Sequence, residues 1–199
     1  MKLGILGGTF NPPHIGHLEI AREVLEELEL DKIIFMVAGS PQLKNNPVIT
    51  PAEQRLAMTR LAVEGENNFE VSSLEIEREG ATYTVETLAE LRQAGAGNDE
   101  LFFIIGMDNL KTLKFWHKPE EIIKECTLVV VPRPGGSEVD ISRLEKDIPG
   151  ISQKLIILKK PFINISASQI RKAVNKKQPI SHLVPAKVEE YIKAGKLYL

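Results

Sequence analysis

Cysteine is almost absent from this chain, because Cys126 is the only one among 199 residues. One thiol cannot close an intrachain disulfide, and a cysteine-based metal cluster is excluded as well. Such sparse cysteine usage is typical of a reducing compartment, so we expect a cytoplasmic protein. Cys126 borders an apolar run, and we predict that it is a small buried side chain.

Long hydrophobic runs and an excess of basic residues are also missing. The apolar stretches are far shorter than the roughly 20 residues of a membrane span, and Gly7 and Gly8 break the first of them, unlike a signal peptide. The 25 lysines and arginines are outnumbered by 27 aspartates and glutamates, which argues against a general nucleic-acid binder. Because 43% of the residues are apolar, the chain can build a globular core. We therefore expect no membrane and no nucleic acid among its partners.

Several signatures of phosphate and hydrolytic chemistry are absent too. The dinucleotide fingerprint G-x-G-x-x-G does not follow the first apolar run, and the P-loop pattern occurs nowhere. The nucleophile elbow G-x-S-x-G and the zinc motif H-E-x-x-H are missing as well. Hydride transfer, P-loop hydrolysis, serine hydrolysis and zinc proteolysis therefore lack their usual sequence support.

Short apolar runs alternate along the chain with helical patterns. Most runs are continuously apolar, which suits parallel strands buried on both faces; they cover residues 3–6, 33–37, 70–74, 101–105, 128–131 and 155–158. Helices are predicted over residues 17–28, 51–63, 84–91, 119–125, 140–147, 170–175 and 185–194. This order predicts the α/β class, with a Rossmann-like doubly wound parallel sheet. We expect one domain over residues 1–199, with a small helical extension over about residues 164–199.

Local signals mark the ends of three helices. Thr50 opens one predicted capping box, with Pro51 at the first helical position, and Ser166 and Gln169 form a second. Gly195 is the predicted C-cap of the last helix. Ligands of doubly wound sheets bind at the carboxyl ends of the strands. We therefore expect one crevice, lined by the residues that follow positions 6, 37, 105 and 158.

The most informative segment joins the first apolar run to the first helix. Gly7 and Gly8 end the run, and His14 and His17 lie where the helix begins. A strand, a glycine turn and a helix N-terminus offer backbone N–H groups and a favourable dipole to a phosphate. Two imidazoles can donate to phosphate oxygens, and Gly16 between them leaves room for a flat ring. The segment predicts a site that holds a phosphate and acts on it; capping or packing a turn is the alternative role of the histidines.

Residues 7–17 resemble the HxGH signature of nucleotidyltransferases. Class I aminoacyl-tRNA synthetases share this signature, but they usually have far longer chains and a second, lysine-containing signature that is absent here. Further matches follow in order over residues 80–84, 104–108, 115–117, 131–135 and 164–171. This ordered set is similar to the bacterial nicotinate mononucleotide adenylyltransferases and covers nearly the whole chain.

The resemblance implies an adenylyltransferase of NAD biosynthesis. Such an enzyme joins ATP and nicotinate mononucleotide to give deamido-NAD and pyrophosphate, with Mg²⁺ as cofactor. The mononucleotide phosphate attacks the α-phosphorus of ATP directly, so the protein supplies positioning and charge stabilisation rather than a nucleophile. The ATP phosphates are expected to hold the Mg²⁺, without a dedicated set of protein ligands.

The resemblance also implies residue roles. The expected catalytic residues, which stabilise charge on the phosphates, are His14, His17, Lys44 and Arg171. The expected ATP site comprises Gly7, Gly8, Thr9, Phe10, His14, Gly16, His17, Gly106, Asp108, Arg133, Ile165, Ser166, Ser168 and Arg171. The expected nicotinate mononucleotide site comprises Thr9, Tyr83, Thr84, Asp108 and Trp116. In it, the backbone of Tyr83 and Thr84 would hold the carboxylate, and Trp116 would stack on the pyridine ring.

Two positions depart from the family pattern. Asn11 stands where members usually have aspartate, and Leu43 stands where their loop commonly has histidine before its basic residue, here Lys44. These departures predict a slowed enzyme, and they leave a nucleotide-binding module with weakened catalysis as one alternative. Adenylyltransferases that act on nicotinamide mononucleotide or on pantetheine phosphate are two others. The sequence leaves a homo-oligomer open.

Overall fold

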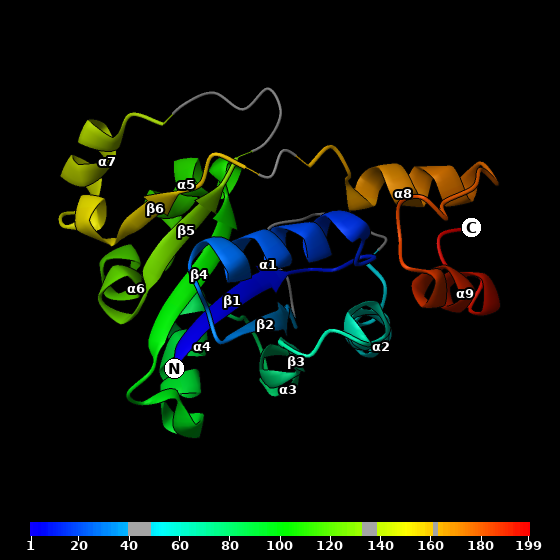
Figure 1. Ribbon diagram of the computed structural model, residues 1–199, viewed down its shortest axis with the longest axis horizontal. Coiled ribbons are helices and arrows are strands. Elements are labelled where there is room, and N and C mark those ends of the chain that lie inside the picture. The colour runs from blue at the N-terminus through cyan, green and yellow to red at the C-terminus, as the bar shows by residue number, and fades with distance from the viewer. Residues whose placement is uncertain (40–48, 133–138, 161–162) are drawn as a thin grey trace.

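A parallel sheet forms the centre of the molecule (Figure 1). The computed structural model describes residues 1–39, 49–132, 139–160 and 163–199. Within them, six strands lie in the order β3-β2-β1-β4-β5-β6. They are β1 (Lys2–Gly8), β2 (Lys32–Val37), β3 (Phe69–Ser72), β4 (Glu100–Gly106), β5 (Thr127–Val131) and β6 (Leu155–Ile157). The order reverses between β1 and β4, which confirms the predicted doubly wound sheet and puts its switch point at the end of the first strand.

Helices flank the sheet, and two more follow its last strand at the C-terminal end of the chain. They are α1 (Ile15–Glu27), α2 (Ala52–Val63), α3 (Leu74–Glu77), α4 (Thr84–Leu91), α5 (Met107–Thr112), α6 (Pro119–Glu125), α7 (Ile141–Asp147), α8 (Ala167–Asn175) and α9 (Ala186–Ala194). Further helical turns cover Arg92–Ala96, Leu113–Phe115 and Ile151–Lys154. Among the described residues, no helix combines the length and apolar character that a membrane crossing requires.

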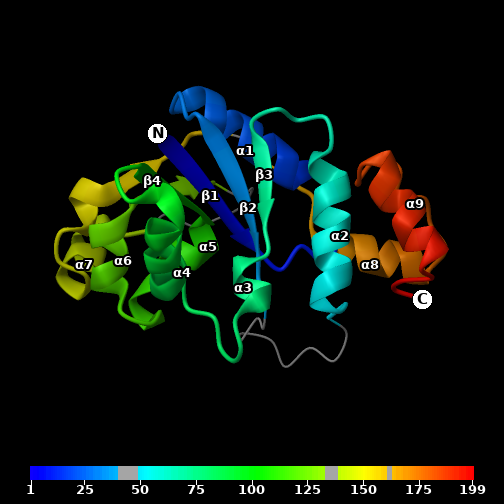
Figure 2. The ribbon, with the colours of Figure 1, turned by 90° about the horizontal axis from the view of Figure 1, so that it is seen from below.

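Each face of the sheet has its own core, because strand side chains point alternately to opposite faces. In β4, Phe103 packs into a cluster with Leu88 of α4 and Ile122 of α6. Its neighbour Ile104 packs into a second cluster with Leu18 of α1. Figure 2 shows α1 and α4 on opposite sides of the strands. Burial on both faces explains why most of the strand sequences are continuously apolar rather than alternating.

The last two helices pack on α2 instead of on the sheet. Met58 and Ala62 of α2 form a third buried cluster with Ile170 of α8 and with Val188 and Ile192 of α9. Both ribbon views show α8 and α9 beside α2, beyond the edge of the sheet (Figures 1 and 2). The C-terminal extension is therefore attached through a helix that also packs on the sheet.

Most predicted elements are present, with some errors at their ends. The helices predicted over 84–91 and 119–125 are confirmed as α4 and α6, and the capping box of Ser166 and Gln169 is confirmed at α8. The Thr50 box is wrong: Pro51 is the N-cap of α2 and no side chain caps it. The strand predicted over 70–74 is too long, because Leu74 is the first residue of α3.

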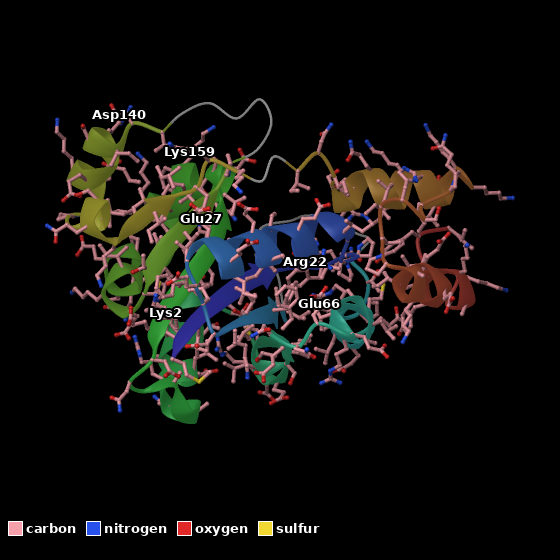
Figure 3. The ribbon with its side chains drawn as sticks, in the orientation of Figure 1. Lys2, Arg22, Glu27, Glu66, Asp140 and Lys159 are labelled. Carbon is pink, nitrogen blue, oxygen red and sulfur yellow. The ribbon has the colours of Figure 1, made fainter. Side chains whose placement is uncertain are left out.

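Surface ion pairs join neighbouring elements. Arg22 of α1 pairs with Glu66, which lies between α2 and β3 (Figure 3). Both side chains are partly exposed to solvent, and exposed pairs of this kind contribute at most about 1 kcal/mol. The buried clusters, rather than these pairs, hold the layers together.

Cys126 is confirmed as a buried residue, and burial raises the pKa of its thiol to about 12.

Candidate active site

The two histidines of the β1–α1 segment form one unit at the start of α1. His14 is the N-cap, and its backbone N–H donates to Nδ1 of His17 over 3.1 Å. The two rings stack with their centroids 3.6 Å apart and their planes 20° from parallel. Because Nδ1 of His17 accepts, the neutral ring carries its proton on Nε2, and that N–H is a donor of the kind a phosphate needs. Capping and phosphate binding are thus compatible roles for this pair.

The Phe10 side chain packs against the histidine pair through the ring of His17. Its side chain is only 2% exposed, and its ring meets that of His17 edge-on at 4.9 Å. A Cβ on Gly8 would lie 2.9 Å from the Phe10 ring, so glycine is needed there for protein packing as well as for any ligand. The buried Phe10 side chain leaves only its backbone for the predicted nucleotide contact.

Gly16 brings a distant segment against the start of α1. A Cβ at this position would lie 2.4 Å from Cγ2 of Ile163 and 3.1 Å from Nδ1 of His14. In this structure the space beside Gly16 is therefore filled by protein side chains, and the place of Gly16 in the expected ATP site stays a prediction. The same contact places the chain that leads into α8 beside the histidines, as the predicted ATP site requires.

Arg171 connects α8 directly to the β1–α1 segment. Its Nη1 donates to the backbone oxygen of Asn11 over 2.7 Å, and its Nη2 donates to Oγ of Ser168 over 3.2 Å. A guanidinium has five N–H donors, so these two bonds leave others for an anion. Ser166 caps α8, where its Oγ accepts from the backbone N–H of Gln169. The residues predicted to bind ATP from α1 and from α8 are thus brought together.

Trp116, predicted to bind the nicotinate group, packs on the face of the sheet opposite to the Phe10 cluster. Trp116 is half-buried, and its ring meets Phe103 edge-on at 6.3 Å. Phe103 in turn borders Gly7, where a Cβ would lie 3.3 Å from the Phe103 ring. Trp116 is therefore separated from the end of β1 by a single ring.

Ile165, also predicted for the ATP site, packs against the C-terminal cluster and is partly buried.

Tyr83 and Thr84 form the start of α4. Tyr83 is the N-cap, and its ring lies 4.5 Å from that of His117, a residue that sequence reasoning left outside the site. One turn later, the Thr87 hydroxyl donates to a carboxylate oxygen of Glu75 in α3 over 2.7 Å. Burial raises the pKa of Glu75 above its ordinary value. The helix start predicted to hold a carboxylate is thus fixed to the rest of the fold through α3.

Asp108 lies at the carboxyl edge of β4. Gly106 is the N-cap of α5 and Asp108 is exposed in its first turn. Gly106 rather than Asp108 therefore caps α5, and the place of Asp108 in both expected nucleotide sites stays a prediction. Lys44 and Arg133, together with Leu43, lie outside the described residues.

Two residues near the site escaped the sequence analysis. Arg55 of α2 is 1% exposed and donates to the backbone oxygen of Thr9 over 2.9 Å. Tyr198, near the end of the chain, donates through its hydroxyl to Oδ1 of Asn11 over 2.8 Å. A signal for Arg55 exists, because it lies three and four residues before the buried Met58 and Thr59 on one helical stripe.

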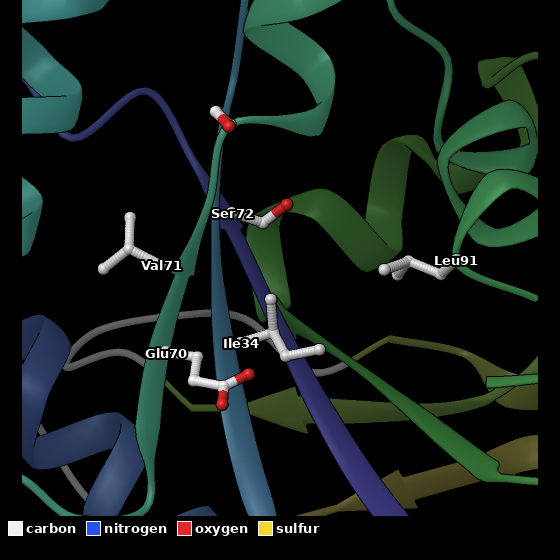
Figure 4. Close-up of a pocket in the computed structure, with 6 residues that line it drawn as sticks. Ile34, Glu70, Val71, Ser72 and Leu91 are labelled. Atoms are coloured by element: carbon white, nitrogen blue, oxygen red, sulfur yellow. The ribbon is translucent and has the colours of Figure 1, made fainter. Parts of the chain in front are cut away.

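A cavity of about 340 Å³ lies elsewhere, along β2 and β3. Figure 4 shows its lining side chains, among them Ile34, Glu70, Ser72 and Leu91. These residues do not come from the β1–α1 segment, so the cavity is distinct from the histidine pair. Within the described ranges, no group of three or more histidine, cysteine, aspartate or glutamate side chains could hold a metal ion.

Known proteins with similar sequences and structures agree with the family that the sequence resembles. The cytidylyltransferase-like family model matches residues 5–173. A probable nicotinate-nucleotide adenylyltransferase of Dehalococcoides mccartyi is 46% identical over 100% of this chain and 97% of its own length. The protein of the same description from Thermomicrobium roseum is 41% identical over 99% and 91%. The Plasmodium falciparum nicotinic acid mononucleotide adenylyltransferase complexed with NaAD matches in structure with a TM-score of 0.79, at 20% identity over 99% and 97% of the two chains.

Proposed function

Because the chain belongs to the cytidylyltransferase-like family and aligns along its whole length with nicotinate-nucleotide adenylyltransferases, we propose that it transfers the adenylyl group of ATP to nicotinate mononucleotide. A phosphate oxygen of the mononucleotide forms a bond to the α-phosphorus of ATP, and the bond from that phosphorus to the β-phosphate bridging oxygen breaks. The products are deamido-NAD and pyrophosphate, as in NAD biosynthesis.

One observation carries the proposal most directly. At the switch point of the sheet, the paired rings of His14 and His17 lie next to the segment that Arg171 contacts from α8. Donors from the two helices therefore converge on the place where the fold class binds ligands. In the proposed reaction, His14, His17 and Arg171 bind the ATP phosphates and stabilise the charge that passes to the leaving pyrophosphate. Lys44 and Arg133 are proposed to assist there.

The second substrate would bind on the Trp116 side. Backbone N–H groups at the start of α4 would hold the nicotinate carboxylate, since helix N-termini favour anions. Trp116 would stack on the pyridine ring, and Asp108 would accept from a ribose hydroxyl. Thr9, at the end of β1 between the two halves of the site, would contact both nucleotides.

ATP enters such a reaction as a complex with a divalent cation, and we propose Mg²⁺. The triphosphate itself is proposed to carry this ion, without a dedicated set of protein ligands. The ion would neutralise phosphate charge as the transfer proceeds. A cytoplasmic location and a possible homo-oligomer stay predictions.

The proposal is tested by measuring pyrophosphate release from MgATP with nicotinate mononucleotide and, in parallel, with nicotinamide mononucleotide. We expect release with the nicotinate form at a much higher kcat/KM. Equal release with both would move specificity away from the carboxylate site. Binding of ATP without release from either would instead favour the nucleotide-binding module and implicate Asn11 and Leu43.

A further inference from the structure

Arg55 is a buried cation that contacts three parts of the backbone around the site. Its Nε donates to the oxygen of Thr50 over 2.9 Å, and its two terminal nitrogens donate to the oxygens of Thr9 and Gly39 over 2.9 and 3.0 Å. Buried charges are expensive unless they are paired. Among the described residues no carboxylate forms an ion pair with it, so backbone carbonyls provide its compensation. Burial lowers the pKa of Arg55, although an arginine remains charged in proteins.

Tyr198 provides a second contact with the same segment. Its hydroxyl donates to Oδ1 of Asn11, whose own side chain is buried. The backbone oxygen of Asn11 accepts from Arg171. Side chains from α2, from α8 and from residue 198 therefore all form hydrogen bonds with residues 9–11. These side chains lie far apart in the sequence. This segment leads from β1 into the histidine pair.

We propose that Arg55 and Tyr198 are positioning residues, which hold residues 9–11 in the conformation that receives the ATP phosphates. The inference rests on the proposed adenylyl transfer. In this proposal, neither the Arg55 nor the Tyr198 side chain contacts the reacting atoms. Their bonds fix the backbone and the Asn11 side chain instead. Displacement of a segment that receives the ATP phosphates weakens and misaligns the binding of ATP, so kcat/KM for ATP falls.

The experiment compares two conservative variants with matched controls. Tyr198→Phe removes only the hydroxyl that reaches Asn11, and Tyr191→Phe makes the same change on α9, where the ring packs against the C-terminal cluster. Arg55→Lys keeps the charge but replaces the planar guanidinium with a compact ammonium, which lacks the geometry that reaches the three separate carbonyls. Arg60→Lys makes the same change at an exposed position of α2. Steady-state pyrophosphate release is measured while each substrate is varied in turn, together with the melting temperature.

We expect Tyr198→Phe to raise KM for ATP and to lower kcat/KM for ATP by about tenfold, as one lost hydrogen bond can do. KM for nicotinate mononucleotide stays within about twofold, and both controls match the wild type. Arg55→Lys has the larger effect. If it does not fold, Tyr198→Phe alone decides.

A merely structural role gives a different result. Fewer folded molecules lower the apparent kcat and leave the KM for ATP and the KM for nicotinate mononucleotide unchanged, and this outcome would overturn the proposal. Wild-type kinetics in Tyr198→Phe would overturn it too. Absence of release by the wild type itself would reject the proposed function instead, so the two failures are distinguishable.

Discussion

At the scale of single residues, His17 has a structural task and a proposed chemical one. Its Nδ1 accepts from the backbone N–H of His14, and its ring contacts those of His14 and Phe10. These contacts fix the ring and leave the opposite nitrogen as the donor side. A donor held in place before the reaction stabilises developing charge without a cost of reorganisation.

His17→Ala is therefore expected to lower kcat by about a hundredfold, as loss of one fixed donor does in other enzymes. KM for nicotinate mononucleotide is expected to change much less, because that substrate is proposed to bind on the Trp116 side. Steady-state kinetics with both substrates tests this, with the exposed His182→Ala as control. Equal losses in kcat and in mononucleotide affinity would contradict a transition-state role.

Glu75 predicts a dependence of stability on pH. Burial raises the pKa of its carboxyl, so the folded protein binds that proton more tightly than the unfolded chain does. The contribution of Glu75 to stability is therefore fully present below the ordinary glutamate pKa, and it is lost as pH rises through the raised one. Glu75→Gln does not titrate and can still accept from Thr87.

Urea unfolding at a pH of about 4 and of about 8 measures this effect. The free energy of unfolding of Glu75→Gln is expected to rise relative to the wild type as pH increases. Glu79→Gln, at an exposed position nearby, provides the control. A difference between Glu75→Gln and wild type that stays constant, or that falls with pH, would show that the folded carboxyl does not hold its proton more tightly.

The site residues that the sequence predicts differ in a physical way from the two that it does not indicate. His14 and His17 were predicted because their type and spacing indicate phosphate chemistry, and Arg171 was predicted from the family resemblance. The contacts of Arg55 and Tyr198 depend on tertiary packing, which joins Asn11 to a residue 187 positions later. The Ile163 contact at Gly16 was missed for the same reason, since a glycine alone does not reveal what fills the space above it.

At the scale of elements, length and capping decided which predictions were confirmed. Strands with continuous apolar runs and helices with clear stripes were predicted almost to the residue. The short α3 and α5 were missed, because four to six residues do not show a helical period. At Thr50 the capping pattern was present in the sequence, but its backbone oxygen accepts from Arg55 and Pro51 takes the N-cap position.

The caps of α7 and α8 allow stability to be separated from function. Asp140 caps α7 by accepting from the backbone N–H of Arg143 (Figure 3), and Ser166 caps α8. We expect Asp140→Ala and Ser166→Ala each to cost about 1 kcal/mol of stability. Melting temperatures should fall by about 2–4 °C in a chain of this size.

Activity is expected to separate the two variants. Asp140→Ala retains the pyrophosphate release rate of the wild type, and Ser166→Ala raises KM for ATP because its hydroxyl is also proposed to bind the nucleotide. Normal kinetics in Ser166→Ala would leave that serine with its capping role alone.

At the scale of the whole molecule, α2 joins two bodies of packing. Leu56 and Val63 belong to the cluster that covers the sheet, whereas Met58 and Ala62 belong to the C-terminal cluster. Arg55 on the same helix contacts the β1–α1 segment. Because one helix supplies part of each cluster, loss of the C-terminal packing should weaken the sheet as well.

This arrangement predicts that the chain unfolds as one unit. The single tryptophan, Trp116, reports on the cluster beside β4, whereas circular dichroism also reports on α8 and α9. In urea, the two signals are expected to give coincident transitions. Ile192→Ala, in the C-terminal cluster, should lower stability by about 2–5 kcal/mol and shift both transitions equally. If α8 and α9 formed an independent domain, this substitution would move only part of the circular dichroism transition, and the Trp116 fluorescence midpoint would stay where it is in the wild type.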